Sequence, residues 1–261
     1  MATVLVSGVE VAYDRVGQGP PLVFAHGAAL DARMWRPQLA LADEFTVVAW
    51  DEPGAGRSHD VPPGFSLADY ARCLAAVIED LRLGPAQVAG LSWGGTVVLE
   101  LYRSRPDLVR TLLLADTYAG WKGSLPPEEV RARVEGTQRM LAVPAEQFQP
   151  TVPGLFAGAP RAELLRLLSV MAADTRPQTM RTQLFLMAAA DQRDLLPEIS
   201  VPTLLLWGER DARSPLDVAH RFREAIPGAT LVVIRGAGHV SNLEAPEAFN
   251  RAVREFCRAH A

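Results

Sequence analysis

A serine set between glycines is the feature of this sequence with the clearest chemical meaning. Residues 90–94 read Gly-Leu-Ser-Trp-Gly, and Gly95 follows directly. A strand-like apolar run precedes them and a helix-like run comes after. In that setting the G-x-S-x-G pattern predicts a nucleophile elbow, a sharp strand-to-helix turn that holds the serine clear of the sheet. The glycines avoid side chains that would collide with the neighbouring strand and helix. We therefore expect Ser92 to be a nucleophile.

A serine hydroxyl needs a base to activate it, and the base needs an acid to orient it. Two loops further along the chain offer these groups. Asp211 ends the segment Gly-Glu-Arg-Asp after the strand-like run 203–207, and His239 ends Gly-Ala-Gly-His after the run 230–234. The order serine, aspartate, histidine is the one expected when a strand-to-helix elbow carries the nucleophile. Ser92, Asp211 and His239 are the predicted catalytic triad.

Other residues of the same types compete for these roles. Asp116 ends a strand-like run and is the alternative acid. His26 follows an apolar run near the expected site, where shaping a loop suits it better than proton transfer. Asp51 precedes the elbow, so we expect it to fix the loop after it, together with Arg57. The remaining histidines are expected to face solvent: His59, His220 and His260.

The tetrahedral intermediate of acyl transfer carries an oxyanion, which needs backbone N–H donors. One donor is expected from Trp93, directly after the nucleophile at the start of a helix. We assign the second to Ala28, in the loop after the apolar run 21–25, because Gly27 permits a close turn there. The predicted oxyanion hole is therefore formed by the N–H groups of Ala28 and Trp93.

The elements that would position these residues alternate along the chain. Strand-like runs are expected at residues 3–7, 9–15, 21–25, 45–51, 87–91, 111–115, 203–207 and 230–234. Helical spacing is expected at residues 35–41, 67–81, 93–103, 215–225 and 246–259. This alternation predicts an α/β protein with a mostly parallel sheet and helices on both faces.

Two helix starts carry capping signals. Ser66, with Asp69 three residues later, predicts a capping box. Ser214 followed by Pro215 predicts an N-cap and a proline at the first helical position.

Residues 120–197 break the alternation, because they are helix-like, poor in strands and rich in proline. We predict a core made of residues 1–119 and 198–261, interrupted by an all-helical cap, or lid, of residues 120–197. Inserted at the carboxyl ends of the strands, it would cover the elbow. Its apolar residues fit either a substrate pocket or the lid's own core, and we favour the core: Met140, Leu141, Phe148, Leu155, Phe156, Phe185, Leu186 and Met187.

The composition limits the class of protein. A chain of 261 residues that is 49% hydrophobic is typical of one globular domain with an insertion. A net charge of -4 gives no basic surface for nucleic acid. No apolar run approaches the roughly 18 residues that span a bilayer, and the first residues lack a basic signal-peptide region. Cys73 and Cys257 have no nearby thiol partner, which fits a reducing cytoplasm. We expect a cytoplasmic protein with neither membrane nor nucleic-acid partners.

Together these residues resemble the α/β-hydrolase superfamily. Residues 26–35 are similar to the His-Gly loop of its small bacterial members, and residues 51–58 to their Asp-x-x-Gly-x-Gly-x-Ser loop. With the elbow and residues 208–211 and 236–239, the similarity is closest to a group of aryl esterases, cofactor-free perhydrolases and enol-lactone hydrolases. The resemblance implies a core sheet of about eight strands, a helical lid, no metal and no organic cofactor.

Two positions depart from that group. Ala28 stands where some of its esterases carry a bulky aromatic residue, which leaves more room on the acyl side. Trp93 stands where methionine is frequent. In related folds that dehalogenate substrates or open epoxides the nucleophile is aspartate, so Ser92 argues against both reactions.

The favoured interpretation is a serine hydrolase that cleaves a small carboxylic ester or lactone through an acyl-enzyme. The same triad could act on a C–C bond, on a thioester or in perhydrolysis, and the lid would decide among these. A ligand-binding protein that retains the triad is a third possibility, because fold does not fix function. Turnover of a simple ester separates the enzymes from the binding protein.

Overall fold

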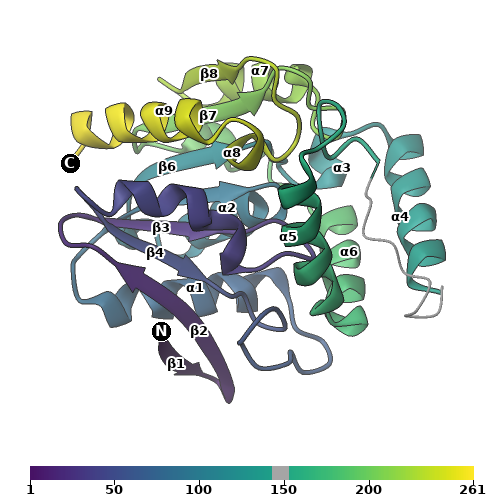
Figure 1. The fold of residues 1–261 in the computed structure, drawn as a ribbon, viewed down its shortest axis with the longest axis horizontal. Helices are drawn as coiled ribbons and strands as arrows, with labels where there is room; N and C mark the ends of the chain where they lie inside the picture. The colour runs from purple at the N-terminus through teal and green to yellow at the C-terminus, as the bar shows by residue number, and fades with distance from the viewer. Residues whose placement is uncertain (143–152) are drawn as a thin grey trace.

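An eight-stranded sheet forms the centre of the computed structural model, which describes residues 1–142 and 153–261 (Figure 1). The strand order is β1-β2-β4-β3-β5-β6-β7-β8. β1 pairs with β2 and β2 with β4 in antiparallel fashion, and all other neighbours are parallel. The predicted mostly parallel sheet is thereby confirmed. The strands are β1 Ala2–Val6, β2 Val9–Val16, β3 Pro21–Ala25, β4 Thr46–Trp50, β5 Ala86–Leu91, β6 Val109–Ala115, β7 Thr203–Gly208 and β8 Thr230–Ile234.

The central strands are buried along their whole length because helices cover both faces of the sheet. Successive side chains point to opposite faces. In β3, for example, Val23 and Ala25 join one apolar cluster, whereas Leu22 and Phe24 join the other. This arrangement explains why these strands read as continuous apolar runs.

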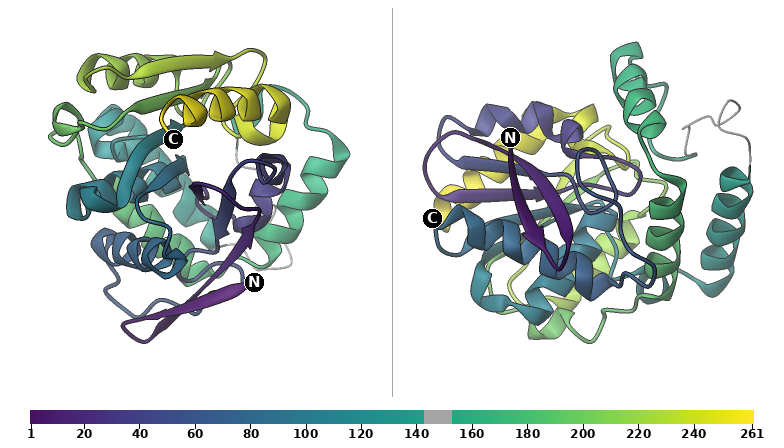
Figure 2. Two further views of the ribbon diagram at one scale, coloured as in Figure 1. Left: turned by 90° about the vertical axis from the view of Figure 1, so that its left-hand side faces the viewer. Right: turned by 90° about the horizontal axis from the view of Figure 1, so that it is seen from below.

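Helices α1 (Leu67–Leu81), α2 (Trp93–Ser104) and α7 (Leu216–Ala225) contribute to the first cluster. The 3-10 helix η1 (Ala32–Leu41) and helix α9 (Pro246–Ala259) contribute to the second. Figure 2 shows these two sets of helices on opposite sides of the sheet. Two short elements complete the core, η2 (Pro106–Leu108) and α8 (Ser241–Glu244).

Of the two helix starts that carried capping signals, one is confirmed and one is not. The capping box at α1 is confirmed, since the Ser66 side chain accepts from Asp69 N–H while the Asp69 carboxylate accepts from Ser66 N–H. The expected cap at Ser214 is wrong, because α7 begins one residue later, with Pro215 as its N-cap. The Ser214 hydroxyl is buried and donates instead to the carbonyl of Thr117 at 2.7 Å.

Between β6 and β7 the described residues form helices α3 (Trp121–Ser124), α4 (Pro127–Leu141), α5 (Ala162–Ala173) and α6 (Pro177–Ala189), then η4 (Leu196–Glu198). None of the described residues of this segment belongs to a strand. Helices α4, α5 and α6 gather at one end of the sheet (Figures 1 and 2). A separate cap with bounds at 120 and 197 stays a prediction.

Within residues 1–142 and 153–261, no helix combines the length and apolarity needed to cross a membrane. Both cysteines are buried, and burial raises the pKa of each thiol to about 12. At neutral pH they are therefore small apolar residues of the core.

Candidate active site

Ser92 lies in the turn between β5 and α2, with φ of 55° and ψ of -118°. A non-glycine residue at positive φ is strained, and such strain concentrates at functional sites. The turn requires glycine on both sides: a Cβ at Gly94 would overlap the carbonyl of Ala25, and one at Gly90 would overlap the backbone of Gly94. The turn is fixed further by Ser92 N–H, which donates to Ala115 at 3.0 Å.

The structure brings the three predicted triad residues together. His239 Nε2 lies 2.9 Å from Ser92 Oγ, and His239 Nδ1 lies 2.8 Å from Asp211 Oδ2. The other carboxylate oxygen of Asp211 accepts from the N–H groups of Arg213 and Ser214, both at 2.8 Å. With Nδ1–H donating to Asp211, Nε2 is left to accept the serine proton.

The imidazole of His239 is buried, and burial is the largest cause that lowers its pKa below the ordinary value of 6.5. The charges of Arg213 and Arg133 lower this pKa further, whereas Asp211 opposes them. A neutral imidazole near pH 7 is the form that a general base requires.

Asp116, the alternative acid, makes contacts of a different kind. Its carboxylate accepts from the N–H of Gly208 at 2.7 Å and from the hydroxyl of Ser241 at 2.5 Å. Burial, followed by the nearby charge of Asp211, raises the pKa of Asp116 well above its usual range. None of the described hydrogen bonds of Asp116 involves a histidine, so the structure does not favour this alternative acid. Asp116 instead links the end of β7 to the loop after His239.

The two N–H groups predicted for an oxyanion hole belong to loops that flank Ser92. Ala28 follows β3, and Trp93 opens α2. Among the residues that the structure describes, neither N–H has a hydrogen-bond acceptor. Donors left open beside a nucleophile are what an oxyanion site needs.

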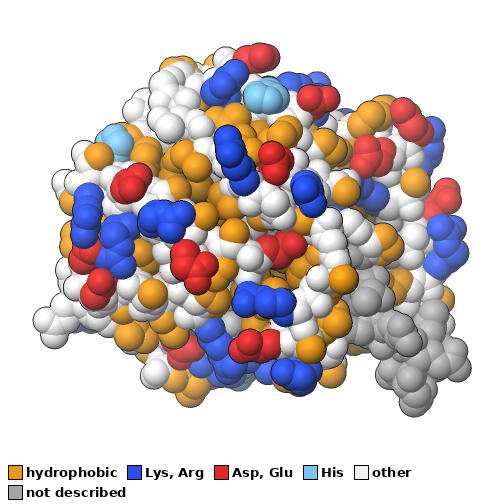
Figure 3. Space-filling model, turned by 45° about the horizontal axis from the view of Figure 1, so that its top comes forward, with side chains coloured by type: hydrophobic (Ala, Val, Ile, Leu, Met, Phe, Trp, Pro, Cys, Tyr) orange, Lys and Arg blue, Asp and Glu red, His pale blue; other side chains and the backbone are white. Residues whose placement is uncertain are grey.

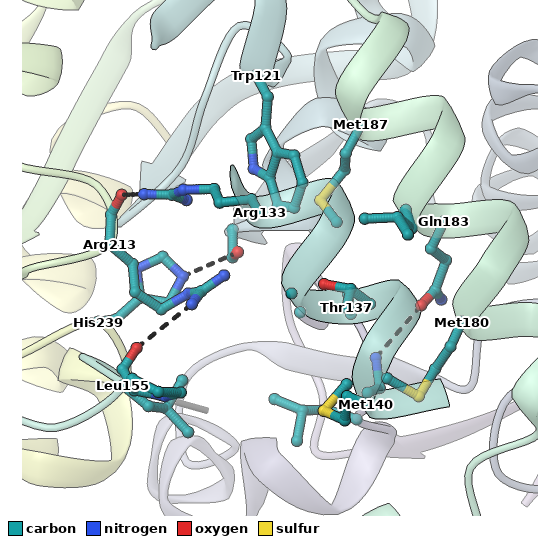
Figure 4. Close-up of a pocket in the computed structure, with 18 of the residues that line it drawn as sticks. Trp121, Arg133, Thr137, Met140, Leu155, Met180, Gln183, Met187, Arg213 and His239 are labelled. Carbon is teal, nitrogen blue, oxygen red and sulfur yellow. Dashed lines mark hydrogen bonds between the residues drawn. The ribbon is translucent and has the colours of Figure 1, made fainter. Parts of the chain in front are cut away.

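A buried carboxyl that the sequence analysis did not single out connects these two loops. Glu52 accepts from the indole N–H of Trp93 at 2.6 Å and contacts the amide nitrogen of Gln183. The amide oxygen of Gln183 in turn accepts from the N–H of Ala29, at 3.3 Å (Figure 4). Ala29 has φ of 61° and stands directly after Ala28. The chain of contacts thus runs from the turn after Ser92 through Glu52 to helix α6 and back to the loop that carries Ala28.

His26 holds the neighbouring loops in the way its position suggested. Its Nε2 accepts from the N–H of Glu52 at 3.0 Å, and its Nδ1 lies 2.9 Å from the carbonyl of Gly27. Burial lowers the pKa of His26, so the ring is neutral. The expected contact of Asp51 with Arg57 is confirmed, with Nε at 2.5 Å from the carboxylate.

A cavity of about 470 Å³ opens onto Ser92 and His239 (Figure 4). It is lined by the loops after β3 and β5, by α4 and α6, and by the loops that carry Arg213 and His239. Most of the lining is apolar, which suits a small organic substrate.

The apolar residues expected to form the lid's own core divide between several environments. Met140, Leu155 and Met187 line the cavity, whereas Leu186 and Phe156 pack on the two core clusters. Phe185 is 52% exposed. Leu141 is half-buried and Phe148 lies outside the described residues. Met187 also belongs to the first core cluster and Leu155 packs on the second, so both fit core and pocket alike, whereas Met140 is in neither cluster and lines the cavity.

The loop that carries His239 is tied to the segment between β6 and β7. His239 N–H donates to the carbonyl of Leu155 at 3.0 Å. The carboxylate of Glu244 accepts from Ala157 N–H at 3.0 Å and from Gly238 N–H at 2.7 Å. A Cβ at Gly238 would overlap the backbone of Ala157, so glycine is required for this close approach.

Comparisons with known proteins relate the chain to several hydrolases. The chain is 32% identical to a putative carbamate hydrolase RutD of Azorhizobium caulinodans, over 95% of each chain. It is 28% identical to 3-oxoadipate enol-lactonase 2 of Acinetobacter baylyi, over 96% of this chain and 94% of the relative. A thermophilic esterase from Thermogutta terrifontis, solved with malate bound, superposes with a TM-score of 0.87 at 32% identity, covering 99% and 97% of the two chains. The model of the alpha/beta hydrolase family matches residues 22–252. The chain belongs to the alpha/beta hydrolase family.

Proposed function

We propose that the protein is a serine hydrolase that cleaves small carboxylic esters or lactones through an acyl-enzyme. The observation that carries this proposal is the pair of short contacts from Ser92 to His239 and from His239 to Asp211. The names of the relatives, an enol-lactonase and an esterase among them, support acyl transfer as the reaction class.

In the proposed mechanism His239 Nε2 takes the hydroxyl proton as Ser92 Oγ attacks the substrate carbonyl carbon. Asp211 holds the ring in the required tautomer and stabilises the imidazolium. The N–H groups of Ala28 and Trp93 bind the oxyanion. The imidazolium then gives its proton to the leaving alkoxide, which leaves an acyl-enzyme. Water, deprotonated by the same histidine, attacks the acyl group and releases the acid.

The position of the cavity supports a small acyl group. Ala28 lies in its wall, where its methyl group leaves space beside the oxyanion site. Trp93 does not take up that space, because its indole is fully buried behind the turn against Tyr70, with ring centroids 5.3 Å apart. The acyl chain would lie among the apolar side chains of α4 and α6.

Hydrolysis of p-nitrophenyl acetate, butyrate and octanoate tests the proposal. We expect turnover of the shorter esters by the wild type and none by Ser92→Ala. Labelling of Ser92 by a fluorophosphonate, located by peptide mass spectrometry, gives a second readout. If neither turnover nor labelling occurs, the proposal is wrong, and a C–C bond substrate or a binding role becomes the better hypothesis.

A further inference from the structure

The walls of the active-site cavity carry positive charge only. Its ionisable lining residues, among those that the structure describes, are Arg133, Arg213 and His239, and none is acidic. The outer surface is different, since Figure 3 shows Arg and Lys side chains interspersed with Asp and Glu across the face turned to the viewer. The cavity is therefore a place where an anion would be favoured.

Arg133 already has a counter-charge within the protein. Its guanidinium contacts the carboxylate of Glu129 at 2.5 Å and donates to the Tyr118 hydroxyl at 2.9 Å. It also lies over the rings of Tyr118 and Trp121, at 5.6 and 5.4 Å from their centroids. Another bond, at 2.6 Å, goes to the backbone carbonyl of Arg213. Arg133 thus acts as a rigid support for α4 and for the loop that carries Arg213.

Arg213 has no such counter-charge among the residues that the structure describes. Its guanidinium makes one long contact, 3.4 Å from Nη1 to the carbonyl of Pro153, and among the described residues no carboxylate lies within ion-pair distance of it. The desolvation of this half-buried group and the nearby charge of Arg133 lower its pKa, yet arginine remains charged in proteins. A guanidinium with open donors in a cavity is suited to a carboxylate, which it can bind through two parallel bonds.

We propose that Arg213 is the anchor for a carboxylate at the far end of the substrate, so that the preferred substrates are hemiesters or lactones of small dicarboxylic acids. This inference rests on the proposed function, because it places the reacting carbonyl at Ser92. Because Ser92 and Arg213 line the same cavity, the distance between them then selects the length of the acyl chain. Arg213 follows Asp211 by two residues, so the same loop orients the catalytic histidine and binds the substrate carboxylate.

Two matched ester series test the proposal. One series contains mono-4-nitrophenyl esters of the diacids from succinate to pimelate, and the other contains the same esters with the free carboxyl methylated. We expect the wild type to favour the free acid in kcat/KM at one chain length. In Arg213→Gln the ratio between the two series should fall by about 10- to 100-fold, as for the loss of a charge-assisted bond. Arg210→Gln is the matched control, because this exposed arginine lies in the same loop outside the cavity.

Binding gives a readout that does not need turnover. Titration of glutarate and of its dimethyl ester into Ser92→Ala, followed by calorimetry, should show binding of the diacid only, and Arg213→Gln on that background should abolish it. If no ester is hydrolysed but this binding pattern is found, the proposed function fails and the carboxylate site stands. If esters are hydrolysed with equal preference for both series, in wild type and Arg213→Gln alike, the inference is overturned. Binding that survives the substitution overturns it as well.

Discussion

The indole N–H of Trp93 donates at 2.6 Å to the buried carboxylate of Glu52, whose other oxygen contacts the side-chain amide of Gln183. Gln183 belongs to α6 and accepts from Ala29 N–H. Burial raises the pKa of Glu52 well above its usual range, and the hydrogen bond from Trp93 opposes this effect. In its ionised form the carboxylate can accept both N–H donors, whereas an amide at its place must turn its NH₂ toward one of them. Glu52 therefore links α6 to the two loops that carry the predicted oxyanion donors, Ala28 and Trp93.

We predict that Glu52→Gln lowers kcat about tenfold and leaves KM little changed. The loss is smaller than that for removing an oxyanion donor, because the donors are displaced and not removed. The unmatched N–H groups should also lower the free energy of unfolding by about 1–3 kcal/mol. The double variant Glu52→Gln/Gln183→Glu exchanges amide and carboxylate and restores every donor–acceptor pair, so kcat should recover. Steady-state kinetics with thermal unfolding check this, and a double variant slower than Glu52→Gln would contradict the positioning role.

Ser92→Ala should abolish ester turnover and leave the melting temperature nearly unchanged. The hydroxyl makes its one described contact with His239, so its loss breaks no other bond of the fold. Turnover of p-nitrophenyl acetate and differential scanning calorimetry on the same preparation check this. Residual activity at the wild-type level would show that another residue is the nucleophile.

The two acids of the site should respond differently to amide substitution. Asp211→Asn should reduce kcat by about 10³- to 10⁴-fold, because the amide favours the wrong tautomer of His239. Asp116→Asn should act on stability, lowering the free energy of unfolding by about 1–3 kcal/mol, since Asp116 accepts from Gly208 and Ser241. Denaturant titration beside kinetics separates these effects. The reverse pattern would make Asp116 the catalytic acid.

The pH dependence follows from the lowered pKa of His239. The base must be neutral, so kcat/KM should rise with pH through an ionisation below 6.5 and reach a plateau by pH 7. Removing the positive charge in Arg213→Gln should raise this pKa and move the acidic limb to higher pH. A pH–rate profile with p-nitrophenyl acetate, recorded for the wild type and for Arg213→Gln, measures the acidic limb of each. An acidic limb that moves to lower pH in the variant would contradict the electrostatic argument.

Ala28→Trp should narrow the range of acyl chains. Ala28 lies in the cavity wall beside the nucleophile, and an indole there would occupy part of the space that the acyl chain uses. We expect activity on octanoate to fall more than activity on acetate. An unchanged ratio between the two esters would place the acyl chain elsewhere.

Local patterns were sufficient to predict the sheet and the positions of Ser92, Asp211 and His239. The elbow, the strand ends and the glycine-rich loops are each encoded by residues close in sequence, and the parallel sheet brings its strand ends to one edge. Glu52 escaped notice because it stands in a polar loop, and its partner Gln183 is 131 positions away. The sequence offered one local signal for Glu52. It directly follows Asp51 at the end of a fully buried strand, where a second acid is also expected to be buried.

The roles of Ser214 and Arg213 depend on tertiary contacts in the same way. A serine before proline favours a cap, but burial against Thr117 gave its hydroxyl a different acceptor. Nothing in the sequence distinguishes Arg213 from other arginines in loops, and only the fold places it in the wall of the cavity.

The contacts of Leu155 and Ala157 with the His239 loop have a consequence for protein engineering. Chimeras that exchange the segment between β6 and β7 are an obvious route to new specificity. In this protein, however, the exchanged segment is hydrogen-bonded to the core: the carbonyl of Leu155 accepts from His239 N–H, and Glu244 accepts from both Ala157 N–H and Gly238 N–H. A transplanted segment that lacks a backbone of the same shape at these positions would leave the histidine loop unsupported. Exchange of α4 and α6 is the graft that this architecture should tolerate, provided that residues 153–157, Gln183 and Arg133 are retained, since these hold the loops around Ser92.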